Sequence, residues 1–189
     1  TGRILGAQIV GFDGVDKRMD VLASAIRAGL TAADLTELDL AYAPPYGSAK
    51  DPVNMAGYVI ENLRAGRVEQ HHWDEVAGLP ADGSVVLLDV RTPGEVRRQG
   101  LLRPDAVNIP LDELRNRLGE LDPAKKIYVN CFSGLRSYLA CRILSQHGYR
   151  CSNLAGGWRF WSYNATGRAH DAAPTHLCGS PPGQVGAAV

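Results

Sequence analysis

Cys131 lies in the stretch "YVNCFSGLRSYLACRIL", where an apolar run ends and a helical pattern begins. A loop that leaves a parallel strand and enters a helix presents unpaired backbone N–H groups, and the helix N-terminus adds partial positive charge. Both features can hold an anion and favour a thiolate over a thiol. We therefore predict that Cys131 is a nucleophile, although its position alone fits a small buried side chain equally well.

The residues after Cys131 favour the catalytic interpretation. Gly134 permits a tight loop, and Arg136 supplies a fixed charge for an anionic substrate. The residues expected to form the anion-binding loop are Phe132, Ser133, Gly134, Leu135, Arg136 and Ser137.

The elements that must position this loop follow from two further patterns. "SVVLLDV" and "KIYVN" are apolar runs typical of parallel strands that are buried on both faces. Helical patterns alternate with them, and "TPGE" has the form of a capping box with proline at the first helical position. The alternation predicts an α/β domain, a parallel sheet with helices on both faces. Asp89 and Arg91 end the first of these strands and should support the loop, because buried charges need partners.

The first third of the chain has a different pattern. Ile4–Val10 is a predicted strand. Apolar spacing then predicts a helix from about Lys17, with Asp16 as its cap and Gly29 as its end.

Two further helices are predicted before residue 64. A capping box starts a short helix at Thr31, and Asp51 should cap a longer one that has proline at its first position. The predicted inner face of this longer helix consists of Val53, Ala56, Ile60 and Leu63. These patterns divide the chain into a first domain at 1–66, a polar linker at 67–72, the α/β domain at 73–163 and a flexible tail at 164–189.

The composition excludes several classes of function. The formal net charge is +0, and no run of Lys or Arg exceeds two residues, so we expect no nucleic-acid partner and no anionic membrane surface. No apolar stretch approaches the length of a membrane span. The four cysteines form neither a CxxC pair nor a zinc pattern, so we expect no metal and a reducing cytoplasm.

The other cysteines and the two adjacent histidines are predicted to have no catalytic or metal-binding role. Cys141 and Cys151 should belong to the core. Cys178 could resolve a persulfide, but it lies in the predicted tail. His71 and His72 have no third ligand nearby in the sequence, which favours a solvated or helix-capping role over metal binding.

Trp73 to Trp161 resembles a rhodanese domain through "LLDVRTPGE", "AVNIPLDELR", "IYVNCFSGLRSYLACRIL" and "NLAGGW", in the family's order and spacing. The resemblance implies a sulfurtransferase in which Cys131 attacks a sulfane sulfur, becomes a persulfide and passes that sulfur to a nucleophilic acceptor. Arg136 would steer thiosulfate or another anionic donor. Related cell-cycle phosphatases have a longer loop, with arginine six residues after cysteine. Here Arg136 follows at five, which favours sulfur over phosphate.

Thr1 to Asn62 resembles the second half of the dimerisation domain of pyridine nucleotide-disulfide oxidoreductases, especially coenzyme A-disulfide reductases and their rhodanese-fused relatives. "GVDKRMDVLASAI" and "LDLAYAPPYGSAKDPVNMAGYV" carry this match. The resemblance implies an α+β fold, a possible homodimer and a coenzyme contact for Tyr42. Simple packing of Tyr42 on a proline turn explains its presence equally well.

The glycines near the N-terminus do not form the GxGxxG fingerprint of a dinucleotide-binding domain. We therefore expect no cofactor in this chain, and FAD, NAD(P)H and coenzyme A only together with further domains of a longer protein. The predicted function is a rhodanese-type sulfurtransferase acting on small sulfur-containing anions or persulfides, within a fragment of a coenzyme A-disulfide or persulfide reductase-like flavoprotein. The alternative is a non-catalytic dimerisation or docking module.

Overall fold

A computed structural model describes residues 1–167 of the chain. It contains two compact units, an N-terminal unit of Thr1–Val68 and a sheet unit that begins at Glu69. The N-terminal unit has three helices, α1 (Val15–Ala28), α2 (Ala32–Glu37) and α3 (Pro52–Arg64). In the sheet unit the strands are β1 (Glu69–His71), β2 (Val85–Asp89), β3 (Val107–Asn108), β4 (Lys126–Asn130) and β5 (Cys151–Leu154). Its α-helices are α4 (Pro93–Gln99), α5 (Leu111–Leu114), α6 (Leu135–Gln146) and α7 (Gly157–Gly167), and two 3-10 turns cover Val76–Gly78 and Leu118–Glu120.

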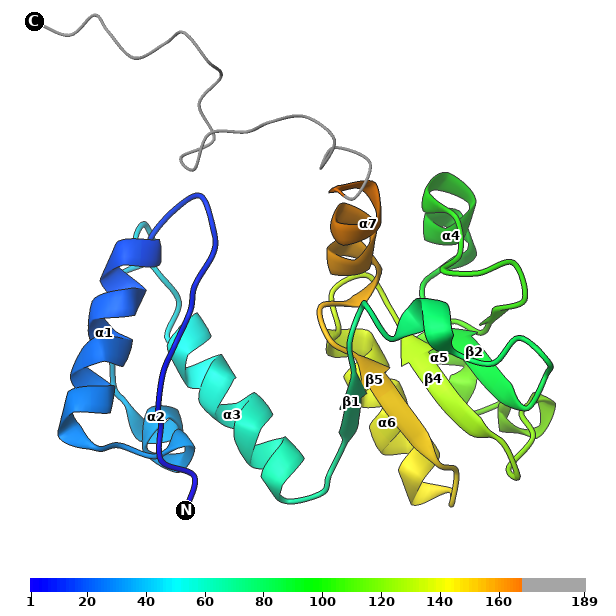
Figure 1. Ribbon diagram of the computed structural model, residues 1–189, viewed down its shortest axis with the longest axis horizontal. Coiled ribbons are helices and arrows are strands. Elements are labelled where there is room, and N and C mark those ends of the chain that lie inside the picture. Colours follow the sequence, from blue (N-terminus) through cyan, green and yellow to red (C-terminus); the bar gives the residue numbers. More distant parts are fainter. Residues whose placement is uncertain (168–189) are drawn as a thin grey trace, which may run out of the picture. The chain divides into compact units, whose positions relative to one another are not determined.

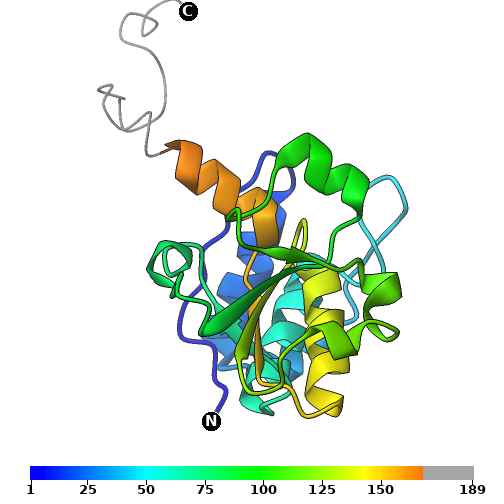
Figure 2. The ribbon, with the colours of Figure 1, turned by 90° about the vertical axis from the view of Figure 1, so that its right-hand side faces the viewer.

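The five strands form one parallel sheet in the order β1-β5-β4-β2-β3. β2 and β4 lie inside the sheet, and Leu88, Ile127 and Val129 on them are fully buried, which explains why their sequences are apolar runs. Helices flank the sheet, as predicted, and α6 runs along β4 and β5 (Figure 2). α4 and α7 stand at the carboxyl ends of the strands that precede them (Figure 1).

The predicted linker at 67–72 is wrong in its central part. Glu69–His71 forms the edge strand β1, which pairs with β5. An edge strand needs few apolar side chains, so its polar sequence gives no strand pattern. The chain therefore passes from α3 into the sheet within a few residues.

The predicted strand at Ile4–Val10 is also wrong. Arg3 makes a single antiparallel bridge to Thr31, and the Ile4 N–H bonds to the Leu30 carbonyl at 3.0 Å. Beyond that point residues 5–10 have no regular secondary structure and no strand partner in the described part of the chain. Ile4 and Ile9 still pack against the core of the N-terminal unit, which accounts for the apolar pattern.

The helix boundaries follow the capping signals with one correction. Thr31, Asp51 and Thr92 cap the starts of α2, α3 and α4, as predicted. All three close capping boxes, although only a simple cap was predicted at Asp51. Gly29 ends α1 in the left-handed conformation, also as predicted. Asp16, however, does not cap α1. The capping position belongs to Gly14, at φ 63, and Asp16 lies in the first turn, where its charge suits the helix dipole.

The inner face of α3 differs from the predicted one. Its buried residues are Val53, Asn54 and Gly57, whereas Ala56, Ile60 and Leu63 are exposed. A Cβ at Gly57 would lie 2.7 Å from the Ala32 carbonyl oxygen, so α3 approaches α2 through a glycine. Apolar spacing alone cannot reveal a contact made by a residue without a side chain.

The predicted tail begins too early, because α7 continues to Gly167. Cys178 and the rest of that tail lie outside the described residues. Within residues 1–167, no helix is both long enough and apolar enough to cross a membrane.

Candidate active site

Cys131 follows β4 directly and is 1% exposed. Its sulfur accepts a hydrogen bond from the Gly134 N–H at 3.1 Å and another from the Ser137 hydroxyl at 3.3 Å. Gly134 is the residue before α6 and has φ 104, a conformation that favours glycine and that directs its N–H toward the sulfur. Two hydrogen-bond donors and the N-terminus of α6 therefore face this sulfur.

The Gly134 peptide group is held from its other side as well. Its carbonyl oxygen accepts hydrogen bonds from the Tyr138 N–H at 3.1 Å and from the Asn153 amide at 3.3 Å. The Ser137 hydroxyl also lies 3.2 Å from this oxygen, but its single proton cannot serve the oxygen and the Cys131 sulfur at the same time. Asn153 is on β5, the strand beside β4. The donor to the sulfur is therefore fixed by contacts from both α6 and the neighbouring strand.

The start of α7 supports the back of the loop. The Trp158 and Arg159 N–H groups donate to the Cys131 and Phe132 carbonyls at 2.8 and 3.0 Å. Gly157 allows this approach, since a Cβ there would lie 2.6 Å from the Cys131 carbonyl oxygen. The rings of Phe132 and Trp158 stack with their centroids 6.4 Å apart. The start of α7 is thus bonded to the loop at the cysteine and at the residue that follows it.

Arg136 is engaged by a carboxylate. Its two terminal nitrogens donate to the two oxygens of Glu95 at 2.8 and 2.6 Å. These hydrogen bonds, together with those from Thr92, lower the pKa of the Glu95 carboxyl to about 2. Glu95 also closes the capping box of α4, so one carboxylate joins the start of α4 to the catalytic loop.

Asp89 and Arg91 form a fully buried ion pair at the carboxyl end of β2, with a closest N–O distance of 2.6 Å. Arg91 also donates to the Gln99 side chain and to the Gly100 carbonyl. Asp89 accepts a hydrogen bond at 3.1 Å from Asn130, the residue that precedes the cysteine. This network satisfies the buried charges and connects β2 to the strand that carries the nucleophile.

Eight residues besides Cys131 were predicted to belong to the site. The structure brings them together at one end of the sheet, where they have different roles. Gly134 and Ser137 contact the sulfur, whereas Arg136 contacts Glu95. Ser133 and Leu135 are exposed on the loop. Phe132 packs on Trp158, while Asp89 and Arg91 lie beneath the loop as a buried pair.

Four residues of the site escape the predictions made from sequence: Glu95, Asn153, Trp158 and Arg159. Glu95 is predicted only as a helix cap, and the last three lie in or beside "NLAGGW", which is cited only for its resemblance. Two adjacent glycines before an aromatic residue are the available signal, because they indicate a close backbone approach.

The remaining cysteine and histidine assignments are partly corrected. Cys141 is buried, as predicted, but Cys151 is only half buried. A hydrogen bond with Cys151 and burial raise the pKa of the Cys141 thiol. His71 is not solvated: it is 4% exposed and bonds to the Ser152 hydroxyl at 2.9 Å.

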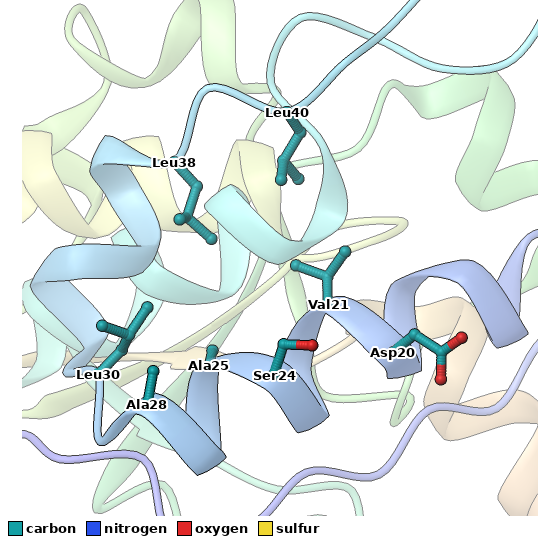
Figure 3. A pocket seen from close by; sticks show the side chains of 8 residues that line it. All are labelled: Asp20, Val21, Ser24, Ala25, Ala28, Leu30, Leu38 and Leu40. Carbon is teal, nitrogen blue, oxygen red and sulfur yellow. The ribbon is translucent and has the colours of Figure 1, made fainter.

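The N-terminal unit has its own grooves. One of about 430 Å³ is bounded by α1 and residues 30–40, and its lining side chains are mostly apolar (Figure 3). A second, of about 210 Å³, is lined in part by Lys17, Arg18 and Tyr42. The Tyr42 side chain is 55% exposed, and Arg18 is paired with Asp51 at 2.9 Å.

Comparison with known proteins decides the family. Residues 72–164 match the family model of the rhodanese-like domain. A sulfurtransferase of Allochromatium vinosum is 42% identical over 79 residues, which cover 72% of its length and 41% of this chain. The chain belongs to the rhodanese-like family. This confirms the rhodanese assignment that was made from the motifs around Cys131. At the level of the family, the matches support a role in sulfur transfer.

Relatives of a second kind are much longer proteins. A coenzyme A disulfide reductase of Staphylococcus haemolyticus is 53% identical over 60 residues, which are 32% of this chain and 14% of that protein. The reduced CoADR-RHD protein of Bacillus anthracis superposes with a TM-score of 0.77 at 47% identity, over 82% of this chain and 28% of that one. The NAD-dependent persulfide reductase of A. fulgidus gives a TM-score of 0.69 at 41% identity, over 80% of this chain and 26% of that one. The chain therefore spans only a small part of these relatives.

Proposed function

We propose that the sheet unit is a rhodanese-type sulfurtransferase with Cys131 as its nucleophile. The observation that carries this proposal is the pair of hydrogen bonds to the Cys131 sulfur, from the Gly134 N–H at 3.1 Å and the Ser137 hydroxyl at 3.3 Å. A sulfur with two donors at a helix N-terminus is suited to act as a thiolate, and the same donors suit the persulfide anion that replaces it.

With thiosulfate as donor, the Cys131 thiolate attacks the outer sulfur. A new S–S bond forms, the S–S bond of thiosulfate breaks, and its electron pair leaves with sulfite. An acceptor such as cyanide then attacks the outer sulfur of the persulfide, and the electron pair of the breaking bond returns to Cys131. Charge and atoms balance in both steps, and no external oxidant or reductant is required.

We also propose that the chain is part of a coenzyme A-disulfide or persulfide reductase-like flavoprotein. The similarity to the Bacillus anthracis and A. fulgidus proteins supports this, because a match over 82% of the chain is longer than either unit alone. FAD, NAD(P)H and coenzyme A would then bind with other domains. The N-terminal unit would take part in a homodimer, where the exposed Tyr42 would contact the coenzyme.

The sulfurtransferase proposal is tested by incubating the protein with thiosulfate and cyanide and measuring thiocyanate. Cys131→Ser should abolish the product, and mass spectrometry without acceptor should find one added sulfur atom on Cys131 of the unsubstituted protein. Ser137→Ala should lower kcat/KM about tenfold through loss of a charge-assisted hydrogen bond, and Ser137→Thr should recover part of it.

Two results would contradict the proposal. Thiocyanate formation that survives Cys131→Ser would exclude this nucleophile. A folded protein that neither forms thiocyanate nor takes up sulfur from thiosulfate or an organic persulfide would favour the non-catalytic docking module.

A further inference from the structure

The loop around Cys131 contains one cationic side chain, and that side chain is neutralised. The two terminal nitrogens of the Arg136 guanidinium donate to the two carboxylate oxygens of Glu95, at 2.8 and 2.6 Å, in a bidentate ion pair. The lowered pKa of Glu95 keeps this partner ionised throughout the neutral range. An incoming anion therefore meets an ion pair at Arg136 and not an unpaired positive charge.

Arg159 is placed differently. Its N–H donates to the Phe132 carbonyl at 3.0 Å, which ties the residue to the catalytic loop. Its guanidinium carbon lies 5.7 Å from the centroid of the Phe132 ring, next to the nucleophile in sequence. The residue is exposed, and among residues 1–167 the structure gives its side chain no ion pair.

We propose that Arg159 is the residue that binds the anionic part of the sulfur donor, while Arg136 acts as a support of the loop. This inference rests on the sulfur-transfer function proposed above and names the charge class of its substrate. The donor would place its sulfane sulfur at Cys131 and its leaving oxyanion, such as the sulfite group of thiosulfate, toward the guanidinium of Arg159.

The ring of Phe132 explains why the charge of Arg159 stays available. An aromatic face attracts a guanidinium through its quadrupole, so it holds the group in position without cancelling its charge. A carboxylate in the same position, like Glu95 beside Arg136, would cancel it. Because Arg159 is exposed, its effect should be moderate and should weaken as salt is added.

Two other arginines provide a competing explanation. Arg97 and Arg98 are exposed on α4, which also stands at the carboxyl end of the sheet (Figure 1). If they determined donor binding, the site would attract anions through a diffuse field. Arg159 differs from them because its backbone is bonded to the loop that holds the nucleophile.

The first test measures binding without reaction. In the Cys131→Ser background, which cannot form a persulfide, thiosulfate affinity is measured by isothermal titration calorimetry at low salt. Arg159→Gln should raise the Kd about fivefold, the effect of one charge contact near the surface. Arg159→Lys should restore most of the affinity.

Two matched controls remove one arginine charge elsewhere. The first is Arg150→Gln, since Arg150 precedes β5 and lies at the opposite end of that strand from the site. The second is Arg98→Gln, since Arg98 is on α4. Both should leave the Kd within a factor of two. A fivefold rise for Arg98→Gln equal to that for Arg159→Gln would overturn the proposal in favour of a diffuse field, and an unchanged Kd for Arg159→Gln would overturn it outright.

The second test uses turnover with two donors that share the reacting sulfur. Thiosulfate carries two negative charges, whereas methanethiosulfonate carries one and releases methanesulfinate in place of sulfite. Arg159→Gln should raise the KM for thiosulfate about fivefold and that for methanethiosulfonate less, with kcat unchanged. Equal increases for both donors, or a fall in kcat alone, would contradict the assignment. A third outcome separates the two proposals. If thiosulfate binding depended on Arg159 but the protein turned over neither donor, the sulfurtransferase proposal would be wrong and the assignment of the anion site to Arg159 would still hold.

Discussion

Gly157 lies against the carbonyl oxygen of Cys131, so close that a Cβ at this glycine would be 2.6 Å from that oxygen. The contact lets the Trp158 N–H reach the same oxygen at 2.8 Å. Gly157 has φ 63, in the left-handed region that favours glycine. The second glycine of "NLAGGW", Gly157, therefore allows α7 to hold the backbone of Cys131 in place.

Gly157→Ala is expected to destabilise the sheet unit by at least about 2 kcal/mol, because strain at positive φ adds to a backbone clash. It should also reduce sulfur transfer in the protein that remains folded, since the loop must shift. Urea unfolding and thiocyanate formation measure the two effects. Gly148→Ala is the matched control: Gly148 has φ 84 but open space around it, so only the strain of about 1 kcal/mol should appear, with activity retained. Equal effects of both variants would contradict this account.

Arg91→Met is expected to cost about 3 to 5 kcal/mol, because it leaves the Asp89 carboxylate buried without its partner. The loss is measured by urea unfolding followed through tryptophan fluorescence. All three tryptophans, Trp73, Trp158 and Trp161, belong to the sheet unit, so the signal reports this unit alone.

The control for this prediction is Arg117→Met. Arg117 bonds Glu113 and Glu120 on an exposed surface, and its loss should leave the unfolding midpoint nearly unchanged. A midpoint for Arg91→Met that matched the control would show that the buried pair does not hold the end of β2 in place.

The stability of the sheet unit should fall as the pH is lowered from 7 to 5. Burial lowers the pKa of His71 from 6.5 to about 4, so the unfolded chain takes up a proton at this residue well before the folded one does. Proton uptake by the unfolded state favours unfolding, and the loss between pH 7 and pH 5 should reach about 2 kcal/mol. Urea unfolding at a series of pH values measures it.

The slope should disappear in His71→Gln and persist in His72→Gln, since the latter replaces a neighbour outside the buried pair with Ser152. A pH dependence that was the same in both variants would assign the effect to other groups. Carboxylates contribute little in this window, because most of them titrate below it.

Local signals determined much of this protein from its sequence. Capping signals at Thr31, Asp51 and Thr92 predicted three helix starts, because a cap is a contact between residues two or three positions apart. The apolar runs of β2 and β4 predicted a parallel sheet, since interior strands are buried on both faces. The position of Cys131 between strand and helix predicted its loop, and the order of motifs predicted the family.

Tertiary structure alone decided which partner each polar group meets. The sequence predicts Arg136 to be a substrate-binding cation, yet in the structure Glu95 of another helix pairs with it. Arg159 contacts the same loop from α7. The polar edge strand Glu69–His71 and the glycine contact of Gly57 likewise leave no periodic pattern. Periodicity records how deeply side chains are buried, but ion pairs and close backbone approaches between distant segments depend on how the whole chain packs.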